Sequence, residues 1–121
     1  MRIATLSFLI LVVTASYTAR ATYNATATGT VAIITQMGVV NGMAAETIAF
    51  TISPMPAAVP GAQFQQFVIS PNSVPDPQTR RNMVALLLSA KATGTPVEVA
   101  YDNLGGFLDQ QLIGVYFIEA L

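Results

Sequence analysis

Residues 76–99 read DPQTRRNMVALLLSAKATGTPVEV, and this stretch decides the fold class of the chain. Asp76 and Pro77 form a typical helix start, in which an N-cap side chain is followed by proline in the first turn. Apolar residues then recur at spacings of three and four, which makes one apolar stripe along a helix. Gly94 marks the end, because glycine takes the left-handed conformation that closes many helices. The stretch therefore predicts a helix over 77–93 that leads directly into a strand.

Three strands are predicted before this helix. Residues 30–37 alternate at a period of two, and 63–69 form a less regular strand that follows a turn at Pro60-Gly61. The clearest alternation covers 47–52, where three large apolar side chains share the core face. The opposite face of that strand consists of three small uncharged residues, Thr47, Ala49 and Thr51. We expect this second face to be open to solvent or to a ligand.

Two more strands follow the helix. Residues 97–102 alternate cleanly, and a glycine-rich turn separates them from 112–119. The last segment is apolar on both sides, which predicts a central strand. Residues 22–29 lack periodicity and are expected to be an extended lead-in. The order β-β-β-α-β-β predicts a single, mostly-β domain with one helix over residues 30–121.

The N-terminal residues have the pattern of a secretory signal. Met1-Arg2 gives a positive start, residues 3–13 are mostly apolar, and Ala19-Arg20-Ala21 fits an A-x-A cleavage site. A membrane span needs about 20 apolar residues, so this run is too short to serve as an anchor. We expect residues 1–21 to be removed as a signal peptide, which leaves a secreted or periplasmic protein without a membrane span.

Composition excludes many functions. The chain has 121 residues, 53% of them apolar and only 9% charged, against about 25% charged in an average soluble domain. It contains no histidine, cysteine or tryptophan, so it can form no Ser-His-Asp triad, thiolate site, imidazole metal site or disulfide. Residues 22–121 carry three cations and all six acids of the chain, which is unlike a nucleic-acid-binding surface. We expect no enzyme activity, no catalytic residue, no metal and no cofactor.

The element order, the passage from helix through Gly94 into strand, and the signal sequence support a resemblance. The chain is similar to small exported bacterial OB-fold domains, and its layout resembles the B subunits of AB5 toxins, which commonly carry a disulfide that this chain lacks. The resemblance covers residues 30–121 and implies a five-stranded Greek-key barrel. It also implies a non-catalytic binding module that self-associates into a ring. Another small α+β roll with the same elements is the alternative fold.

OB-folds bind oligonucleotides or oligosaccharides on the face of the second and third strands and in the loops after the first and fourth. Five amide and carboxylate side chains lie at these places and are the candidate ligand-binding residues: Asn41, Gln63, Gln65, Asp102 and Asn103. Such groups hydrogen-bond sugar hydroxyls, so a glycan or another cell-surface ligand is expected.

Arg80 and Arg81 are two of the three cations of residues 22–121, and they lie near the helix N-terminus, where the helix dipole disfavours positive charge. They are either solvated side chains beside Asp76 or contacts to another subunit or ligand. A charge-poor surface also fits a second function: a structural or protein-interaction subunit of a secreted complex, covered by a partner protein.

Overall fold

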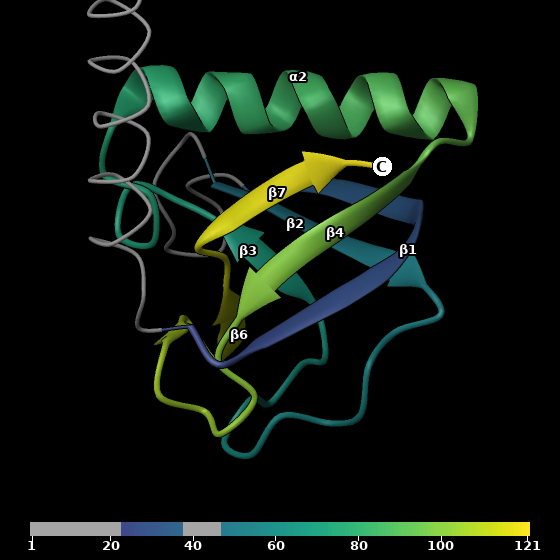
Figure 1. Ribbon diagram of the computed structural model, residues 1–121. Coiled ribbons are helices and arrows are strands. Elements are labelled where there is room, and N and C mark those ends of the chain that lie inside the picture. The colour runs from purple at the N-terminus through teal and green to yellow at the C-terminus, as the bar shows by residue number, and fades with distance from the viewer. Residues whose placement is uncertain (1–22, 38–46) are drawn as a thin grey trace, which may run out of the picture.

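The computed structural model describes residues 23–37 and 47–121. These residues form a curled sheet of seven strands with one helix, which confirms the predicted mostly-β class (Figure 1). The predicted signal peptide (1–21) and Asn41 lie outside the described residues. The elements are β1 (Ala25–Met37), β2 (Thr47–Ser53), β3 (Phe67–Ile69), α2 (Pro77–Thr93), β4 (Pro96–Tyr101), β5 (Leu108–Asp109), β6 (Leu112–Gly114) and β7 (Phe117–Ala120).

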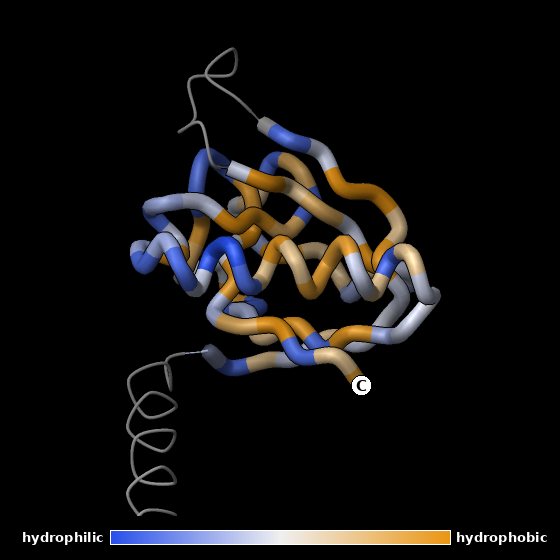
Figure 2. Tube along the Cα trace, turned by 90° about the horizontal axis from the view of Figure 1, so that it is seen from above, coloured by the Kyte–Doolittle hydropathy of each residue, from blue (hydrophilic) through white to orange (hydrophobic). Residues whose placement is uncertain are grey.

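The helix α2 has the predicted bounds and caps. The Asp76 carboxylate accepts hydrogen bonds from the backbone N–H of Thr79 at 2.8 Å and from its hydroxyl at 2.7 Å. Gly94 takes the left-handed conformation, with φ 69°. Seen from above, α2 crosses one end of the curled sheet (Figure 2). Its buried side chains, which include Met83 and Leu87, face the sheet, and the helix contacts β1 and β7.

Strand β1 takes part in two pairings. Residues 25–30 pair with β4 and residues 30–37 pair with β2, both antiparallel. The two pairings overlap at Thr30, next to Gly29, where a Cβ atom would lie 2.8 Å from the carbonyl oxygen of Ser53. Only glycine permits this approach of two backbones. The strand begins at Ala25, so most of the predicted lead-in forms sheet, because β4 supplies a partner that local periodicity does not reveal.

The prediction of a single central strand over residues 112–119 is wrong. This segment is split into β6, which pairs in parallel with β3, and β7, which pairs with β4 at the other end of the strand order. Val115, fully buried, lies between the two strands, and the Tyr116 N–H donates to the Ala100 carbonyl at 2.9 Å. One short segment therefore connects the two ends of the sheet and gives it a barrel-like curl.

The prediction that one face of β2 is open to solvent or a ligand is also wrong in part. Ala49 is fully buried and contacts Val68 and Leu112 in a small second cluster, and Thr47 is 1% exposed. This part of the sheet is therefore covered on both faces. The predicted third strand is shorter than expected, since only its last three residues form β3.

Candidate functional site

A hydrogen-bonded network joins the start of β1 to the loop after β4. The Asn24 side chain donates from Nδ2 to Asp102 Oδ1 at 3.0 Å, and its Oδ1 accepts from the Asn103 backbone N–H at 2.9 Å. The backbone N–H of Leu104 donates to the same Asp102 oxygen at 2.8 Å. Two of the predicted ligand-binding residues, Asp102 and Asn103, thus share one network with Asn24, which sequence reasoning did not select.

The second oxygen of Asp102, Oδ2, accepts no hydrogen bond from the described residues, and Asp102 is half-buried. Oδ2 is the carboxylate atom that lies against Gly106, where a Cβ atom would overlap it. The carboxylate is therefore oriented through Oδ1, and the described hydrogen bonds leave Oδ2 unused.

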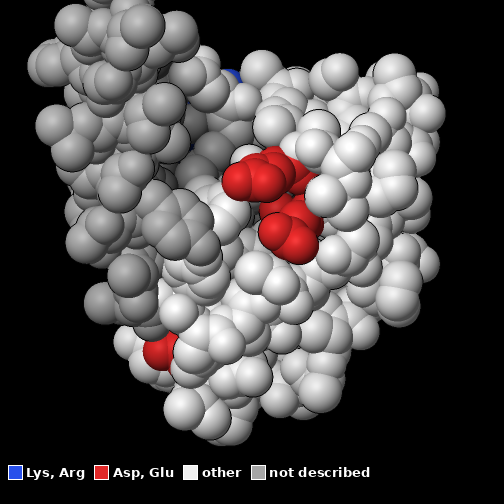
Figure 3. Space-filling model, in the orientation of Figure 1, with Lys and Arg blue, Asp and Glu red and all other residues white. Residues whose placement is uncertain are grey.

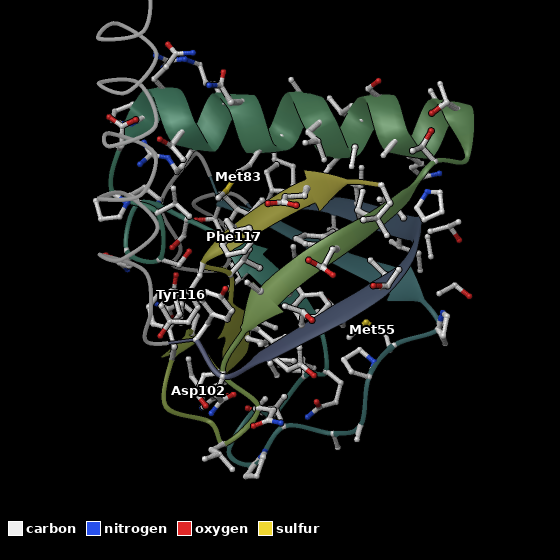
Figure 4. All side chains as sticks on the ribbon, in the orientation of Figure 1. Met55, Met83, Asp102, Tyr116 and Phe117 are labelled. Carbon is white, nitrogen blue, oxygen red and sulfur yellow. The ribbon has the colours of Figure 1, made fainter. Side chains whose placement is uncertain are left out.

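Four half-buried aromatic residues, Tyr23, Phe107, Tyr116 and Phe117, form what we call the aromatic cluster. The ring centroids of Phe107 and Tyr116 are 4.5 Å apart, and Tyr23 meets Tyr116 at 6.2 Å and Phe117 at 5.2 Å, edge to face in the latter pair. Tyr23 is the chain neighbour of Asn24, Phe107 follows Gly106, which lies against Asp102, and Figure 4 shows Tyr116, Phe117 and Asp102 along the same margin of the ribbon. The cluster and the Asn24 network are therefore considered together as one candidate site.

None of the four residues of the aromatic cluster is among the site residues predicted from the sequence. The aromatic residues Phe50, Phe67 and Tyr101 lie in the core, where they are at most 5% exposed and their rings are in contact in series. Tyr116 and Phe117 are only half-buried, although Phe117 also packs against the core.

The predicted glutamines differ in role. Gln65 folds its own loop: Oε1 accepts from the Val59 N–H at 2.9 Å, and Nε2 donates to the Ala62 carbonyl at 3.0 Å. Gln63 is exposed, and its backbone N–H donates to the Gln111 carbonyl at 3.0 Å. No described hydrogen bond links either side chain to Asp102, so the network does not include them.

The loop that contains both glutamines nevertheless touches the loop after β4. Gly105 has φ 81°, and a Cβ atom at this position would overlap the carbonyl oxygen of Pro60. Any other residue would be strained by both the backbone conformation and this contact. The close approach brings the loop 54–66 beside the candidate site.

The two arginines, Arg80 and Arg81, lie in different environments. Arg80 is 6% exposed and donates from Nη1 to the carbonyls of Val74 at 2.8 Å and Pro75 at 3.0 Å, so it is not a solvated side chain. Arg81 is exposed and donates to the Gln78 side chain at 3.2 Å. Arg80 thus fixes the chain entering α2, while Arg81 remains accessible. A role of either residue in an interface stays a prediction.

A second polar cluster lies in the interior. The Ser70 hydroxyl donates to Asp109 Oδ2, and the Ser70 N–H donates to the Ser73 hydroxyl at 2.9 Å. All three residues are at most 9% exposed, so this cluster fixes the turn after β3 and is closed to a ligand. Asp109 therefore belongs to this buried cluster and not to the network of Asn24 and Asp102. Within residues 23–37 and 47–121, no three acidic side chains are grouped as a metal site.

Charge is concentrated at one place on the face formed by β4 and β7. Glu98 and Glu119 are directly opposite each other in the antiparallel register. Figure 3 shows acidic side chains gathered at this place on a face that is otherwise almost free of charge. Like charges directly opposite each other destabilise a strand pair.

Comparison of the chain with protein-family models, with curated proteins and with solved structures found no match. No helix within the described ranges is long and apolar enough to cross a membrane. The geometry of the Asn24 network and the aromatic cluster is therefore what bears on function.

Proposed function

We propose that this protein is a non-catalytic, exported binding module built on an OB-type barrel. The connectivity supports this fold: β1 pairs with both β2 and β4, and the helix lies between β3 and β4. If β6 and β7 are taken as one interrupted strand, that strand pairs with β3 on one side of the sheet and with β4 on the other. The five-stranded Greek-key barrel expected of an OB-fold has such a closing strand.

The proposed ligand is a carbohydrate, bound beside Asp102. One observation carries this proposal: an oriented carboxylate with one unused oxygen adjoins a half-buried aromatic cluster. Sugars offer both of the matching surfaces, since their hydroxyls donate to carboxylates and amides while their C–H faces cover aromatic rings. Asp102 would accept hydroxyl hydrogen bonds through Oδ2, and Tyr116 would supply the ring surface.

Such a site is shallow, with half-buried rings and no tryptophan. A shallow site binds one sugar weakly, and several linked copies bind a surface that displays many sugars much more tightly. Self-association would therefore suit this function. Export would bring the protein to cell-surface glycans.

A glycan array, followed by titration of the best ligand, tests the proposal. Asp102→Asn and Tyr116→Leu should each weaken binding at least tenfold, with thermal unfolding used to confirm that both variants are folded. Glu119→Gln removes one carboxylate from the β4–β7 face and is the matched control, which should bind normally. The proposal is wrong if no glycan binds, or if binding persists unchanged in both site variants.

One observation favours the second candidate, a structural or protein-interaction subunit of a secreted complex. Large apolar side chains are exposed outside the candidate site: Phe64 is 54% exposed, Leu88 55% and Leu121 61%. A partner protein would cover them. Absence of glycan binding, together with a defined second chain that co-purifies in fixed stoichiometry, would favour this function.

A further inference from the structure

The distal half of β1, residues 31–37, has one unpaired edge. These residues pair with β2 on one side. On the other side β4 pairs only as far as Thr30, because β4 begins at Pro96. Within the described part of the chain no other strand continues the sheet there. The backbone groups along this edge are therefore available to another strand.

The sequence of this edge does nothing to prevent such pairing. Residues 31–37 read VAIITQM, with no charged residue, proline or glycine. Natural edge strands are commonly protected by lysine, proline or a bulge. The single irregularity of β1 in this region lies between Val31 and Ile33, and the register is regular from Ile33 onward. Ile33 is 61% exposed, which is unusual for a β-branched apolar side chain on a strand.

We propose that this edge pairs antiparallel with the same edge of a second copy, to form a two-fold dimer with a continuous sheet. The other marginal strands of the described residues fit less well. β5 has two residues, and β7 has four and includes Glu119, whereas α2 packs against β1 and β7 alike and does not distinguish them. The edge that matches residues 31–37 in length is the same edge of a second copy. Because these residues carry no charge, the two copies would not repel each other there. A two-fold axis near Ile33 places the two exposed isoleucines opposite each other and buries both.

This dimer is independent of the proposed glycan site. Asn24 and Asp102 lie at the opposite end of β1, where β4 occupies the edge. Both sites of the dimer would remain open, so loss of the dimer and loss of ligand binding are separate results.

Light scattering after size exclusion, over a hundredfold range of protein concentration, tests the proposal. The protein is purified with its N-terminus as the cell leaves it, and mass spectrometry gives the mass of one chain. The native protein should reach twice that mass, and Ile33→Lys should return it to the mass of one chain. Phe64→Lys changes a side chain of similar exposure in the loop 54–66 and should leave the dimer intact.

A thiol test covers the case in which Ile33→Lys does not fold. The chain has no cysteine, so Ile33→Cys introduces a single thiol. Mild oxidation should convert Ile33→Cys to a covalent dimer, while Phe64→Cys should stay monomeric under the same conditions. A native protein that is monomeric throughout, or a mass of three or more chains, would overturn the proposal. So would a dimer in which Ile33→Cys does not cross-link.

Discussion

The side-chain amide of Asn24 lies 3.0 Å from Asp102 Oδ1, although the two residues are 78 positions apart in the chain. The same side chain accepts the Asn103 N–H, so Asn24 holds the loop after β4 through both of its polar atoms. This contact joins the residue before β1 to the residue after β4. It is part of both the fold and the candidate site.

Asn24→Ala should lower the free energy of unfolding by about 1 kcal/mol, because two partly exposed hydrogen bonds are lost. It should also weaken ligand binding, since Asp102 loses one of the groups that orient it. Urea unfolding measures the first effect. Thr26→Ala, two residues further along the chain at an exposed position of β1, is the control and should change stability by less than about 0.5 kcal/mol. Equal effects of the two substitutions would contradict the role assigned to Asn24.

Leu87 and Leu88 are neighbours in sequence but opposite in environment. Leu87 is fully buried on the face of α2 that packs against the sheet, whereas Leu88 is 55% exposed. Leu87→Ala should cost about 2–5 kcal/mol because it leaves a cavity in the core. Leu88→Ala should stay within about 0.5 kcal/mol of the parent. Chemical denaturation of both variants checks the placement of the helix, and a reversed order of the two would show that α2 is rotated.

Gly29→Ala should destabilise the protein by about 1–3 kcal/mol, because the new Cβ would press on backbone atoms that cannot rotate away. The nearest atom is the Ser53 carbonyl oxygen, at 2.8 Å. Thr28→Ala, at the exposed neighbouring position, is the comparison and should have a small effect. Thermal unfolding of the two proteins suffices, and an unchanged Gly29→Ala variant would argue against the close approach of β1 to Ser53 at this residue.

Glu119→Lys should stabilise the protein by about 0.5 kcal/mol, because it converts a like-charge pair with Glu98 into an opposite-charge pair. Glu119→Gln should give a smaller gain, since it only removes the repulsion. Both gains should shrink when salt is added, because surface charges are screened. Urea unfolding at low and high salt measures them, and a loss of stability in Glu119→Lys would contradict the register of β4 and β7.

The cap of α2 should make stability depend on acid pH. Hydrogen bonds from the Thr79 hydroxyl and then its N–H lower the pKa of Asp76 below its ordinary value of 3.8, with smaller contributions from Arg80 and Arg81. A folded-state pKa below the unfolded value means that the ionised carboxylate stabilises the fold. This contribution is fully present above about pH 4 and is lost as the pH falls through the folded-state pKa.

Asp76→Ala should therefore be less stable than the parent at pH 6, and the difference should shrink as the pH is lowered below 3.8. Asp76→Asn keeps an acceptor at the N-cap without a titrating group. It should be closer to the parent at pH 6. Thermal unfolding across this pH range measures both, and a difference that stays constant with pH would rule out the carboxylate as the source.

The sequence predicted the elements whose signals are local. The caps of α2, Asp76 and Gly94, lie within the segment they bound, and both were identified correctly. The alternation of apolar and polar residues over 97–102 was also sufficient to predict β4. In contrast, the first residues of β1 are alanine, threonine and glycine, and they become strand only because β4 pairs with them. No window of neighbouring residues contains that information.

The candidate site was predictable only in part. Asp102 and Asn103 follow a clear strand, so their place in a loop could be inferred from sequence. Their partner Asn24 could not, because the contact depends on the pairing of β1 with β4. Tyr116 lies in an apolar segment that resembles a buried strand, and its half-exposed position arises from the break between β6 and β7.

That break also determines when the molecule can finish folding. The segment that joins the two ends of the sheet follows every other strand of the described residues in chain order, since β6 begins at Leu112 and β7 ends at Ala120. A chain that is still being synthesised has β3 and β4 without these partners. Contacts so distant in sequence also form late, because they require a large loss of chain entropy. Completion of the sheet therefore waits for the synthesis of residues 112–120, and β3 and β4 lack these partners until then.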